Sequence, residues 1–387
     1  MREPPKSLTS THENREVALL HLAGDTRFPV ATGTEKLDDW LRQLVHEGGS
    51  DLLLVAGVPA SIRVDGKLRR IGAQPLVGTE IEAAILPALS AYGLQLYQRS
   101  LIADSSYAVK SLGRFRINLH HERGSAAAAV RALPPRVPEL SELRLPDEIA
   151  ALAQVQRGLI IVGGATGSGK TTTVAALVNE INREQARHIV TIEDPVEYEH
   201  AHMRGVVEQV EIGIDAADFP IALRAALRQV PDVIVVGEMR DPETAHIALA
   251  AAETGHLVLT TLHTTDVIST VSRIADSFPP ERQNTIRQEM AMALSAVMTQ
   301  KLLRTKSGGL IPAAELLMVS YGARQHIRRN ALQHLHQEIT STRRLGSITL
   351  EQSLVSLVVQ GEISREDALL AAIHPEDLEG SLKVKGL

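Results

Sequence analysis

The sequence predicts an α/β protein in which a small α+β domain precedes a larger domain built on a parallel sheet. Four short apolar runs rich in β-branched residues, separated by segments with helical spacing, predict the parallel sheet: GLIIVGG, HIVTIED, DVIVVGE and HLVLTTLH. Upstream, two helical patterns, a strand pattern, a hairpin pattern and three further strand patterns predict the smaller domain. A stretch with four prolines, residues 134–149, separates the two patterned regions.

Length and composition exclude several classes of protein. A chain of 387 residues exceeds one ordinary core, so we expect at least two domains. The net charge of −6 and the aromatic content of 3% argue against nucleic-acid binding and against base stacking. Cysteine is absent, which excludes disulfides, thiol catalysis and Cys-ligated metals and fits a reducing compartment. No apolar run is long enough for a membrane span, and the first residues carry no apolar signal core.

The N-terminal end of the chain divides into an extension and the start of the smaller domain. Residues 1–36 mix Pro, Ser, Thr and charge with little periodicity, so we expect a flexible N-terminal extension. Residues 37–133 are predicted to form the small α+β domain. Its first helix is expected to begin at Leu37 and to stop before Gly48, because apolar residues recur at helical spacing between them.

The remaining elements of the small domain follow from strand and turn signals. SDLLLVAG predicts a strand, and the pair Asp65-Gly66 between short apolar runs predicts a hairpin turn. Residues 80–99 have a helical pattern. Three strands are expected after them, with turns near Gly113 and Gly124.

Downstream we expect a linker, a core domain and a helical tail. The prolines predict a stiff linker over residues 134–157, which leaves the two domains free to move relative to each other. The four apolar runs place the core domain at 158–310, with helices on both faces of its sheet. Strand patterns run out after about residue 310, so residues 311–387 are predicted to be a helical C-terminal region.

The most specific motif is a phosphate-binding loop. Residues 164–171, GATGSGKT, fit G-x-x-x-x-G-K-[ST] at every required position, between a strand and a helix. Its glycines let backbone N–H groups face a phosphate, and the following helix adds the positive end of its dipole. We expect Lys170 to neutralise the β- and γ-phosphates of ATP and Thr171 to hold Mg²⁺. The expected nucleotide-binding residues are Gly164, Ala165, Thr166, Gly167, Ser168, Gly169, Lys170, Thr171 and Thr172.

Two strand ends carry acids suited to nucleotide hydrolysis. VIVVG followed by Glu238 is Walker B-like, with Glu where many enzymes have Asp. Glu238 is expected to order Mg²⁺ or to polarise the attacking water; the alternative is an acid at an exposed strand terminus. Glu193 begins a second acidic cluster, EDPVEY, which Pro195 stiffens. The alternative interpretation of this cluster is a solvated acidic turn. Which of the two glutamates is the principal base stays open.

Two histidines bracket the strand LVLTTL. His256 and His263 are seven residues apart, so on a strand they project to opposite faces and do not form a chelating pair. Packed or hydrogen-bonding roles account for both. His263, just past the strand end, is better placed to sense a γ-phosphate.

Together and in this order, the motifs resemble the secretion ATPase superfamily, and more closely the pilus retraction (twitching motility) ATPases of type IV pili. GGSDLLLVAGVPASIRVDGKLRRI resembles that family's PAS-like N-terminal domain. TIEDPVEY resembles its Asp box, PDVIVVGEMRDPET its Walker B, and TGHLVLTTLHTTDVISTVSRIADSFP its His box. The resemblance runs from about Leu37 to Leu370. It implies a PAS-like α+β N-terminal domain, a RecA-like P-loop ATPase core and a small helical C-terminal region.

The chain departs from this family's pattern at two places. Leu53 stands where the family usually has His. The family's C-terminal motif, similar to AIRNLIR, is only partly matched by Ala323–Arg329, which puts the retraction-specific role of that segment in doubt. Relatives in pilus assembly and type II secretion usually carry a tetracysteine zinc site, so the absence of Cys favours the retraction branch.

The resemblance also implies partners and a location. It implies a homohexameric ring that hydrolyses ATP with Mg²⁺. It implies that the ring is cytoplasmic, associated peripherally with the inner membrane at the pilus base. The implied partners are an inner-membrane pilus platform protein and a paralogous pilus ATPase, and no nucleic acid is expected.

Three arginines of the small domain complete the candidate site. Arg114 and Arg116 are two residues apart on one predicted strand and project to the same face, and Arg131 follows on the next strand. By pattern alone this is a solvated sheet face with ion pairs. The resemblance implies that these arginines reach the γ-phosphate when the ring closes.

Other functions remain open from the sequence. One is an ATPase of a related type II/IV or conjugation-like secretion system. Another is an accessory ATPase that binds a motor paralogue, although the phosphate loop and Glu238 are intact. A nucleic-acid translocase on the same core is the least favoured, because the chain is acidic and poor in aromatics.

Overall fold

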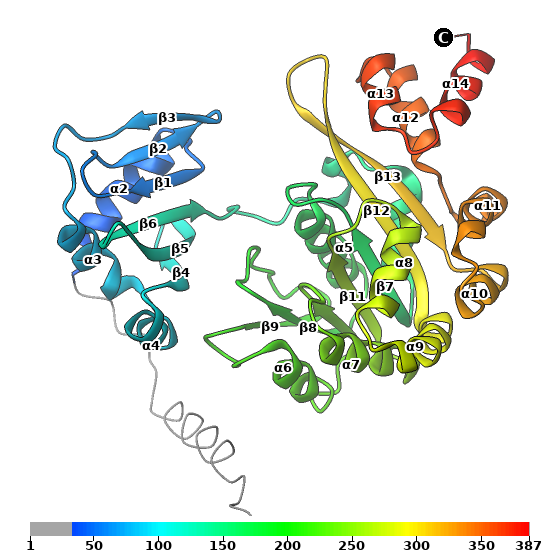
Figure 1. Ribbon diagram of the computed structural model, residues 1–387, viewed down its shortest axis with the longest axis horizontal. Helices are drawn as coiled ribbons and strands as arrows, with labels where there is room; N and C mark the ends of the chain where they lie inside the picture. The colour runs from blue at the N-terminus through cyan, green and yellow to red at the C-terminus, as the bar shows by residue number, and fades with distance from the viewer. Residues whose placement is uncertain (1–32, 387) are drawn as a thin grey trace, which may run out of the picture. The chain divides into compact units, whose positions relative to one another are not determined.

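The computed structural model describes residues 33–386 (Figure 1). The chain forms two compact units, one with residues up to Leu89 together with Leu119–Ala129, the other with Ser90–Asn118 and everything from Val130 onward. Most of the extension expected over residues 1–36 lies outside the described residues. The first described helix, α2 (Glu35–His46), begins slightly before the predicted Leu37 and buries Leu37 and two further leucines of the same face.

The smaller sheet has six strands in the order β3-β2-β1-β6-β5-β4. Its predicted hairpin is confirmed, because Asp65 and Gly66 both have positive φ, 49° and 77°, as a tight two-residue turn requires. The expected three strands with turns near Gly113 and Gly124 are also present. The strands are β1 (Asp51–Leu54), β2 (Ser61–Val64), β3 (Lys67–Arg70), β4 (Ala103–Val109), β5 (Gly113–Glu122) and β6 (Ser125–Ala132).

The helix predicted over residues 80–99 is interrupted. Pro87 lies in a short 3₁₀ turn, η1 (Leu86–Ala88), between α3 (Gly78–Ile85) and α4 (Ala91–Ser100). Proline lacks the N–H that would continue the helical ladder, so the chain restarts at Ser90, whose side chain caps α4.

The larger sheet has seven strands in the order β13-β12-β7-β11-β10-β8-β9. All neighbouring pairs are parallel except β12 with β13, and the four predicted parallel strands are all present. The strands are β7 (Gly158–Gly163), β8 (His188–Glu193), β9 (Val206–Glu211), β10 (Val233–Val236), β11 (Leu257–Leu262), β12 (Leu294–Arg304) and β13 (Leu310–Met318).

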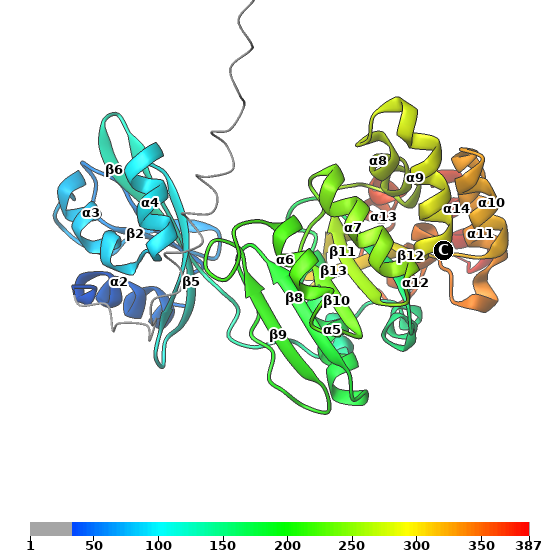
Figure 2. The ribbon, with the colours of Figure 1, turned by 90° about the horizontal axis from the view of Figure 1, so that it is seen from below.

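Helices cover both faces of this sheet, as predicted (Figure 2). Alternate side chains of a strand point to opposite faces of the sheet. In β7, Leu159 and Ile161 pack in one apolar cluster, and Ile160 and Val162 pack in the other. The second cluster includes residues of α5 (Lys170–Glu184) and of the 3₁₀ helix η3 (Asp147–Gln154). The first cluster draws on more helices: α6 (Phe219–Ala226), α7 (Pro242–Glu253), α8 (Val267–Asp276), α9 (Pro280–Ala293), α10 (Tyr321–Arg328) and α11 (Leu335–Ser341).

The prediction that strands run out after about residue 310 is wrong. The β13 strand pairs with β12 as an antiparallel hairpin along its whole length (Figure 1). Its sequence, LIPAAELLM, is rich in Ala, Leu and Glu, which favour helices when nothing else decides. Burial against both faces of the core and pairing with β12 override that preference.

The second half of the predicted linker is folded against the core. Two 3₁₀ helices, η2 (Leu140–Leu143) and η3 (Asp147–Gln154), form within residues 134–157. Ile149 and Leu152 of η3 are almost fully buried in the apolar cluster that contains α5. The prolines therefore stiffen the start of this stretch, whereas its apolar residues anchor the end.

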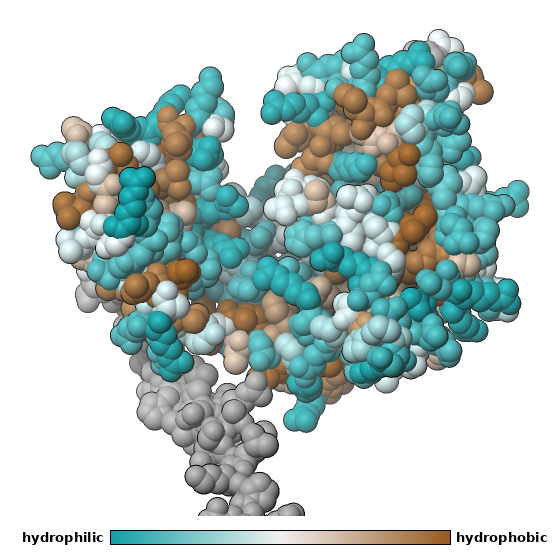
Figure 3. All heavy atoms as spheres, viewed as in Figure 1, coloured by the Kyte–Doolittle hydropathy of each residue, from teal (hydrophilic) through white to brown (hydrophobic). Residues whose placement is uncertain are grey.

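The C-terminal region beyond β13 is helical, as expected. A separate apolar cluster joins three of its helices to Ile311 and Ala313 of β13. Apolar side chains also gather on the surface over these helices and the β12–β13 hairpin (Figure 3), where Leu310 and Leu370 are exposed. The helices are α10 (Tyr321–Arg328), η4 (Leu332–His334), α11 (Leu335–Ser341), η5 (Arg343–Leu345), α12 (Leu350–Val359), α13 (Arg365–Ala371) and α14 (Pro375–Val384).

The two places where the chain departs from the retraction-ATPase pattern have definite surroundings. Leu53 lies half-buried in β1. The segment Ala323–Arg329 forms most of α10, where the Arg324 guanidinium donates to the carbonyl oxygens of Ala291 and Met292 at the end of α9. Across residues 33–386, no helix has both the length and the apolar character that a membrane span needs.

Candidate functional site

The phosphate loop connects β7 to α5 and depends on its glycines. Gly167 and Gly169 have φ of 78° and 87°, in the left-handed region that glycine adopts without strain. At Gly164 a Cβ would lie 2.3 Å from the Ser168 hydroxyl oxygen and 2.8 Å from the Gln300 carbonyl oxygen. The tight curl of the loop therefore requires glycine at position 164.

Lys170 reaches back across the loop that it follows. Its side chain is largely buried, at 7% exposure, and its Nζ donates to the carbonyl oxygens of Gly164 and Ala165, both at 2.9 Å. Burial lowers the pKa of Lys170, and the nearby carboxylates of Glu238 and Glu197 oppose that shift. The ammonium group thus lies at the loop, where the motif predicts a phosphate-binding cation.

A residue far along the chain holds the loop in place. Gln300, on β12 and only 2% exposed, donates from Nε2 to the Ser168 carbonyl oxygen and accepts from the Thr173 hydroxyl at 2.8 Å. One side chain therefore connects the loop to the first turn of α5. Sequence reasoning missed Gln300, because nothing in the local pattern marks a polar residue on an unpredicted strand.

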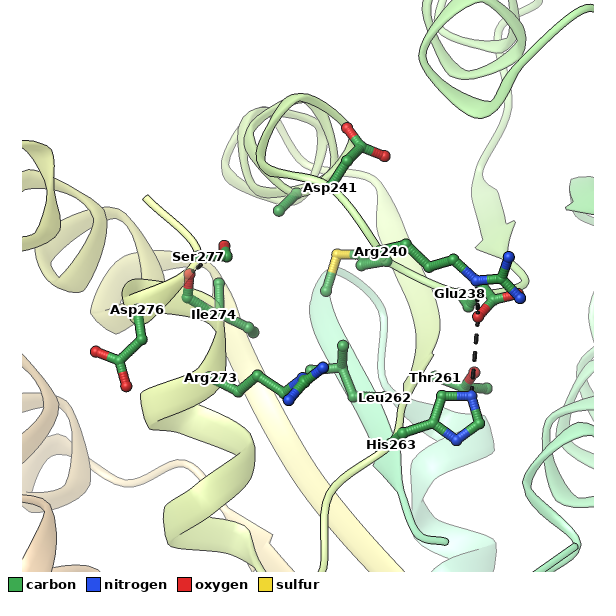
Figure 4. Close-up of a pocket in the computed structure, with 12 residues that line it drawn as sticks. Glu238, Arg240, Asp241, Thr261, Leu262, His263, Arg273, Ile274, Asp276 and Ser277 are labelled. Atoms are coloured by element: carbon green, nitrogen blue, oxygen red, sulfur yellow. Dashed lines mark hydrogen bonds and ion pairs between the residues drawn. The ribbon is translucent and has the colours of Figure 1, made fainter. Parts of the chain in front are cut away.

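Glu238 and His263 lie together at the ends of β10 and β11 (Figure 4). Glu238 Oε2 is 2.5 Å from Arg240 Nε and 3.8 Å from His263 Nε2. The other ring nitrogen of His263, Nδ1, is 3.4 Å from Lys170 Nζ. Burial, followed by the charge of Lys170, lowers the pKa of His263, and the carboxylate of Glu238 opposes that shift. His263 therefore lies between the Walker B-like acid and the lysine of the phosphate loop.

A pocket of about 550 Å³ opens beside this pair. Arg240 and Arg273 extend into it, and Asp241 and Asp276 lie at its margin (Figure 4). Its lining includes Glu238 and His263 but no residue of the phosphate loop. The pocket therefore borders Glu238 and His263 and is not lined by the phosphate loop.

Glu193 occupies a more buried position at the end of β8. Its Oε1 accepts from the Thr191 hydroxyl at 2.7 Å and from Gln209 Nε2 at 3.1 Å. Burial raises the pKa of Glu193, and these two hydrogen bonds oppose the shift. Glu193 also lines a small cavity together with Thr171, which places it near the start of α5.

The rest of the acidic cluster contacts the phosphate-loop helix directly. The Glu197 carboxylate accepts from the Thr171 hydroxyl, and the Tyr198 hydroxyl lies 2.9 Å from Thr172 Oγ1. Burial raises the pKa of Glu197, opposed first by Arg116 and then by Arg131. The sequence pattern predicted an acidic cluster but did not single out Glu197 or Tyr198.

The predicted arginines differ in their surroundings. Arg114 and Arg116 alternate with the buried Phe115 on β5, so they share a face as predicted. Arg114 is mostly buried and binds Glu211 Oε2 at 3.0 Å and the Val196 carbonyl oxygen at 2.6 Å. Arg116 is more exposed and lies 3.4 Å from Asp104. Arg114 therefore has a structural partner, whereas Arg116 is weakly held.

The structure brings some predicted residues together and leaves others apart. Lys170, His263 and Glu238 form a chain of contacts, and Glu193 lies beside Gly237, the residue before Glu238, in a cavity that it shares with Thr171. His256 instead lies 3.0 Å from the Ala251 carbonyl oxygen at the far end of β11. Within the described part of the chain, no group of three or more His, Asp or Glu side chains is arranged to hold a metal ion.

A phosphate loop on a parallel sheet, with acids at the ends of neighbouring strands, defines a P-loop nucleotide-binding protein. Comparison with known proteins narrows this class. Residues 127–370 match the family described as Type II/IV secretion system protein. The chain therefore belongs to this family.

Within the family, the chain is similar to pilus retraction ATPases. It is 40% identical over 331 residues to the type IV pilus retraction ATPase PilT of Pseudomonas aeruginosa, covering 86% of this chain and 96% of that protein. It is also 40% identical over 318 residues to a twitching motility protein of Neisseria gonorrhoeae, covering 82% of this chain and 85% of that protein.

The fold agrees with this similarity. The crystal structure of the pilus retraction motor PilT with bound ADP matches with a TM-score of 0.81 and 41% identity, over 88% of this chain and 98% of that one. An N-terminal domain followed by an ATPase core is common to both, so the fold predicted from the resemblance is confirmed.

Proposed function

We propose that this chain is the ATP-hydrolysing motor that powers retraction of type IV pili and hence twitching motility. The observation that carries the proposal is the 40% identity to a retraction ATPase across nearly the whole of that protein. The intact phosphate loop, with Lys170 at its carbonyl oxygens and Glu238 connected to it through His263, supports an active ATPase.

The proposed chemistry assigns a role to each charged group. Lys170 neutralises the β- and γ-phosphates of ATP, and Glu238 orders and deprotonates the attacking water. Thr171 and Glu238 would hold Mg²⁺, which supplies positive charge to the phosphates when bound. Glu193 is the second carboxylate at the site. The hydroxyl of Thr171 and the carboxylate of Glu238 are oxygen ligands of the kind that Mg²⁺ prefers.

The proposed role of the arginines is limited by their contacts. Arg116 and Arg131 already act electrostatically on Glu197 and are candidates to stabilise charge at the γ-phosphate. Arg114 is engaged by Glu211 and Val196, so a catalytic role requires these contacts to break. We therefore expect Arg116 to contribute more than Arg114 to the chemical step.

The proposed assembly is a homohexamer at the cytoplasmic side of the inner membrane. It acts on the pilus platform protein, with a paralogous pilus ATPase as a further partner. We also propose a first domain over residues 37–133 and a core that begins at residue 158 and extends past 310 to include β13, with motion concentrated at the start of the 134–157 linker because η3 packs against the core. The mass of the purified chain with and without nucleotide, measured by light scattering, tests the hexamer.

A second candidate is an ATPase of a related type II or type IV secretion system. The family description, which covers such systems, favours it over a nucleic-acid translocase. Loss of a secreted protein on gene deletion, with normal twitching, would support this second candidate.

The direct test of the chemistry is ATP hydrolysis by the purified full-length chain. We expect turnover that requires Mg²⁺, stops on addition of a chelator and does not respond to DNA at low salt. We expect Glu193→Gln to hydrolyse slowly and Glu238→Gln to bind ATP without hydrolysing it. Normal hydrolysis by Glu238→Gln with an inactive Glu193→Gln would reverse the two roles. A DNA-stimulated rate with a steep salt dependence would instead support a translocase.

A further inference from the structure

Glu193 shares one face of the sheet with a polar side chain of the edge strand β9. In the parallel pairing of β8 with β9, Thr191 lies opposite Gln209. Residues two apart on a strand point to the same face, so Thr191, Glu193 and Gln209 converge. Thr191 and Gln209 both donate to the same oxygen of Glu193, Oε1.

The amide group of Gln209 is fixed by three partners. Its Nε2 donates to Glu193 Oε1 at 3.1 Å and to the Tyr198 carbonyl oxygen at 2.8 Å. Its Oε1 accepts from the His200 backbone N–H at 2.8 Å. Because two acceptors face one end of the amide and a donor faces the other, the reversed orientation would lose all three hydrogen bonds.

The loop that Gln209 holds is the one that contacts the phosphate-loop helix. Tyr198 bonds Thr172 through its hydroxyl, and Glu197 accepts from Thr171. Gln209 fixes this loop at its backbone, at Tyr198 and His200, and at the same time fixes the carboxylate of Glu193.

We propose that Gln209 is a positioning residue for ATP hydrolysis, which sets the Glu193 carboxylate and the loop of Glu197 and Tyr198 in one geometry against α5. This inference rests on the proposed function, because it needs Glu193 to take part in turnover. Gln209 contacts neither Lys170 nor Glu238 in the described structure. It acts through Glu193 and the loop.

The electrostatics around Glu193 make this positioning matter. The Glu193 carboxylate is buried and close to a second acid, Glu197, both of which disfavour its charged form. The side-chain donors of Thr191 and Gln209 and a backbone N–H of Glu197 compensate. A buried carboxylate that loses one of these donors is both less stable as an anion and freer to rotate.

Two substitutions of Gln209 separate positioning from packing. Gln209→Ala removes all three hydrogen bonds. Gln209→Glu keeps the shape and the acceptor for His200 N–H, but removes the donor and places a second carboxylate against Glu193. Assayed at about pH 8, we expect kcat to fall about 10- to 100-fold in Gln209→Ala, the loss expected for one hydrogen bond to a charged group, and at least as far in Gln209→Glu. KM for ATP should change less than about threefold.

A purely structural role predicts the opposite order, with the near-isosteric Gln209→Glu close to wild type. Gln185→Ala is the matched control, because Gln185 also donates from Nε2 to a carbonyl oxygen, that of Ala153, away from Glu193. It should retain kcat. If Gln209→Ala is poorly folded, Thr191→Val tests the same idea, since it removes only the other donor to Glu193 and should lower kcat in the same direction.

A double-mutant cycle with Glu193→Gln tests whether Gln209 affects kcat through Glu193. If Gln209 acts mainly through Glu193, adding Gln209→Ala to Glu193→Gln should cost much less than it costs in the wild-type chain. A wild-type kcat for Gln209→Ala, or a fully additive effect in the cycle, would overturn the proposal. Failure of the proposed function is distinguishable, because it would appear as absent turnover in the unsubstituted chain.

Discussion

Replacing Gln300 with Leu tests whether the phosphate loop is held from β12. The side chain is 2% exposed and joins the Ser168 carbonyl oxygen to the Thr173 hydroxyl. Leucine has a similar size but cannot form either hydrogen bond. The substitution therefore leaves two buried polar groups, one at each side of the loop, without their partner.

The expected cost follows from those two groups. A buried polar group that loses its partner costs about 1–3 kcal/mol, so the free energy of unfolding should fall by roughly 2–4 kcal/mol after the apolar gain from leucine is allowed for. In a unit of this size that is a fall in Tm of roughly 5–15 °C. Because Ser168 is part of the loop, ADP should also bind about tenfold more weakly.

Thermal unfolding and ADP titration of the purified variant measure both effects. Gln360→Leu is the matched control, because Gln360 is exposed and its side-chain amide donates to the Ser356 hydroxyl at 3.3 Å, away from the phosphate loop. The control should change neither quantity. An unchanged Tm together with unchanged ADP affinity in Gln300→Leu would refute the view that β12 holds the loop.

Further substitutions test the remaining charged groups. Lys170→Ala should abolish ATP hydrolysis, and turnover within about tenfold of wild type would contradict the assignment of the site. Glu238→Gln should retain ATP binding in a filter or fluorescence assay and lose hydrolysis. Arg116→Ala should leave nucleotide affinity unchanged and lower kcat about 100-fold or more. A wild-type kcat would mean that Arg116 only belongs to a solvated sheet face and has no role in hydrolysis. Burial raises the pKa of Glu315 to about 7 from an ordinary 4.5, so its favourable contribution to stability is complete below pH 4.5 and is lost as the pH rises through 7. The Tm of the wild-type chain should therefore fall between about pH 5 and pH 8, and this fall should be absent in Glu315→Gln. If the Tm of the variant falls as much as that of the wild type, Glu315 is not the cause.

The parallel sheet and the phosphate loop could be predicted because their signals are local. Strands buried on both faces need continuous apolar runs, and the loop needs glycines and a lysine at fixed spacing. The hairpin at Asp65-Gly66 was predictable for the same reason, since few residue pairs accept two positive φ angles.

The elements that were missed depend on distant partners. The sequence of β13 favours a helix, and only its pairing with β12 makes it a strand. The η3 helix lies in a proline-rich stretch that predicts a linker, and only its apolar contacts with α5 show that it belongs to the core. Gln300 and Gln209 belong to no motif. Gln300 bonds the phosphate loop and α5, and Gln209 bonds Glu193 on the neighbouring strand, so the role of each depends on residues far along the chain. Because β12 also carries Ser, Thr, Lys and Arg and no strand was predicted there, the sequence offered no signal that singles out Gln300.

The central claim is that ATP hydrolysis by this chain retracts type IV pili. The most direct measurement is deletion of the gene in the bacterium that carries it, with surface pili counted by electron microscopy and twitching scored on agar. The account predicts cells that are piliated but do not twitch, restored by the wild-type gene and not by one encoding Glu238→Gln. Normal twitching in the deletion strain, or a strain that lacks surface pili, would contradict it.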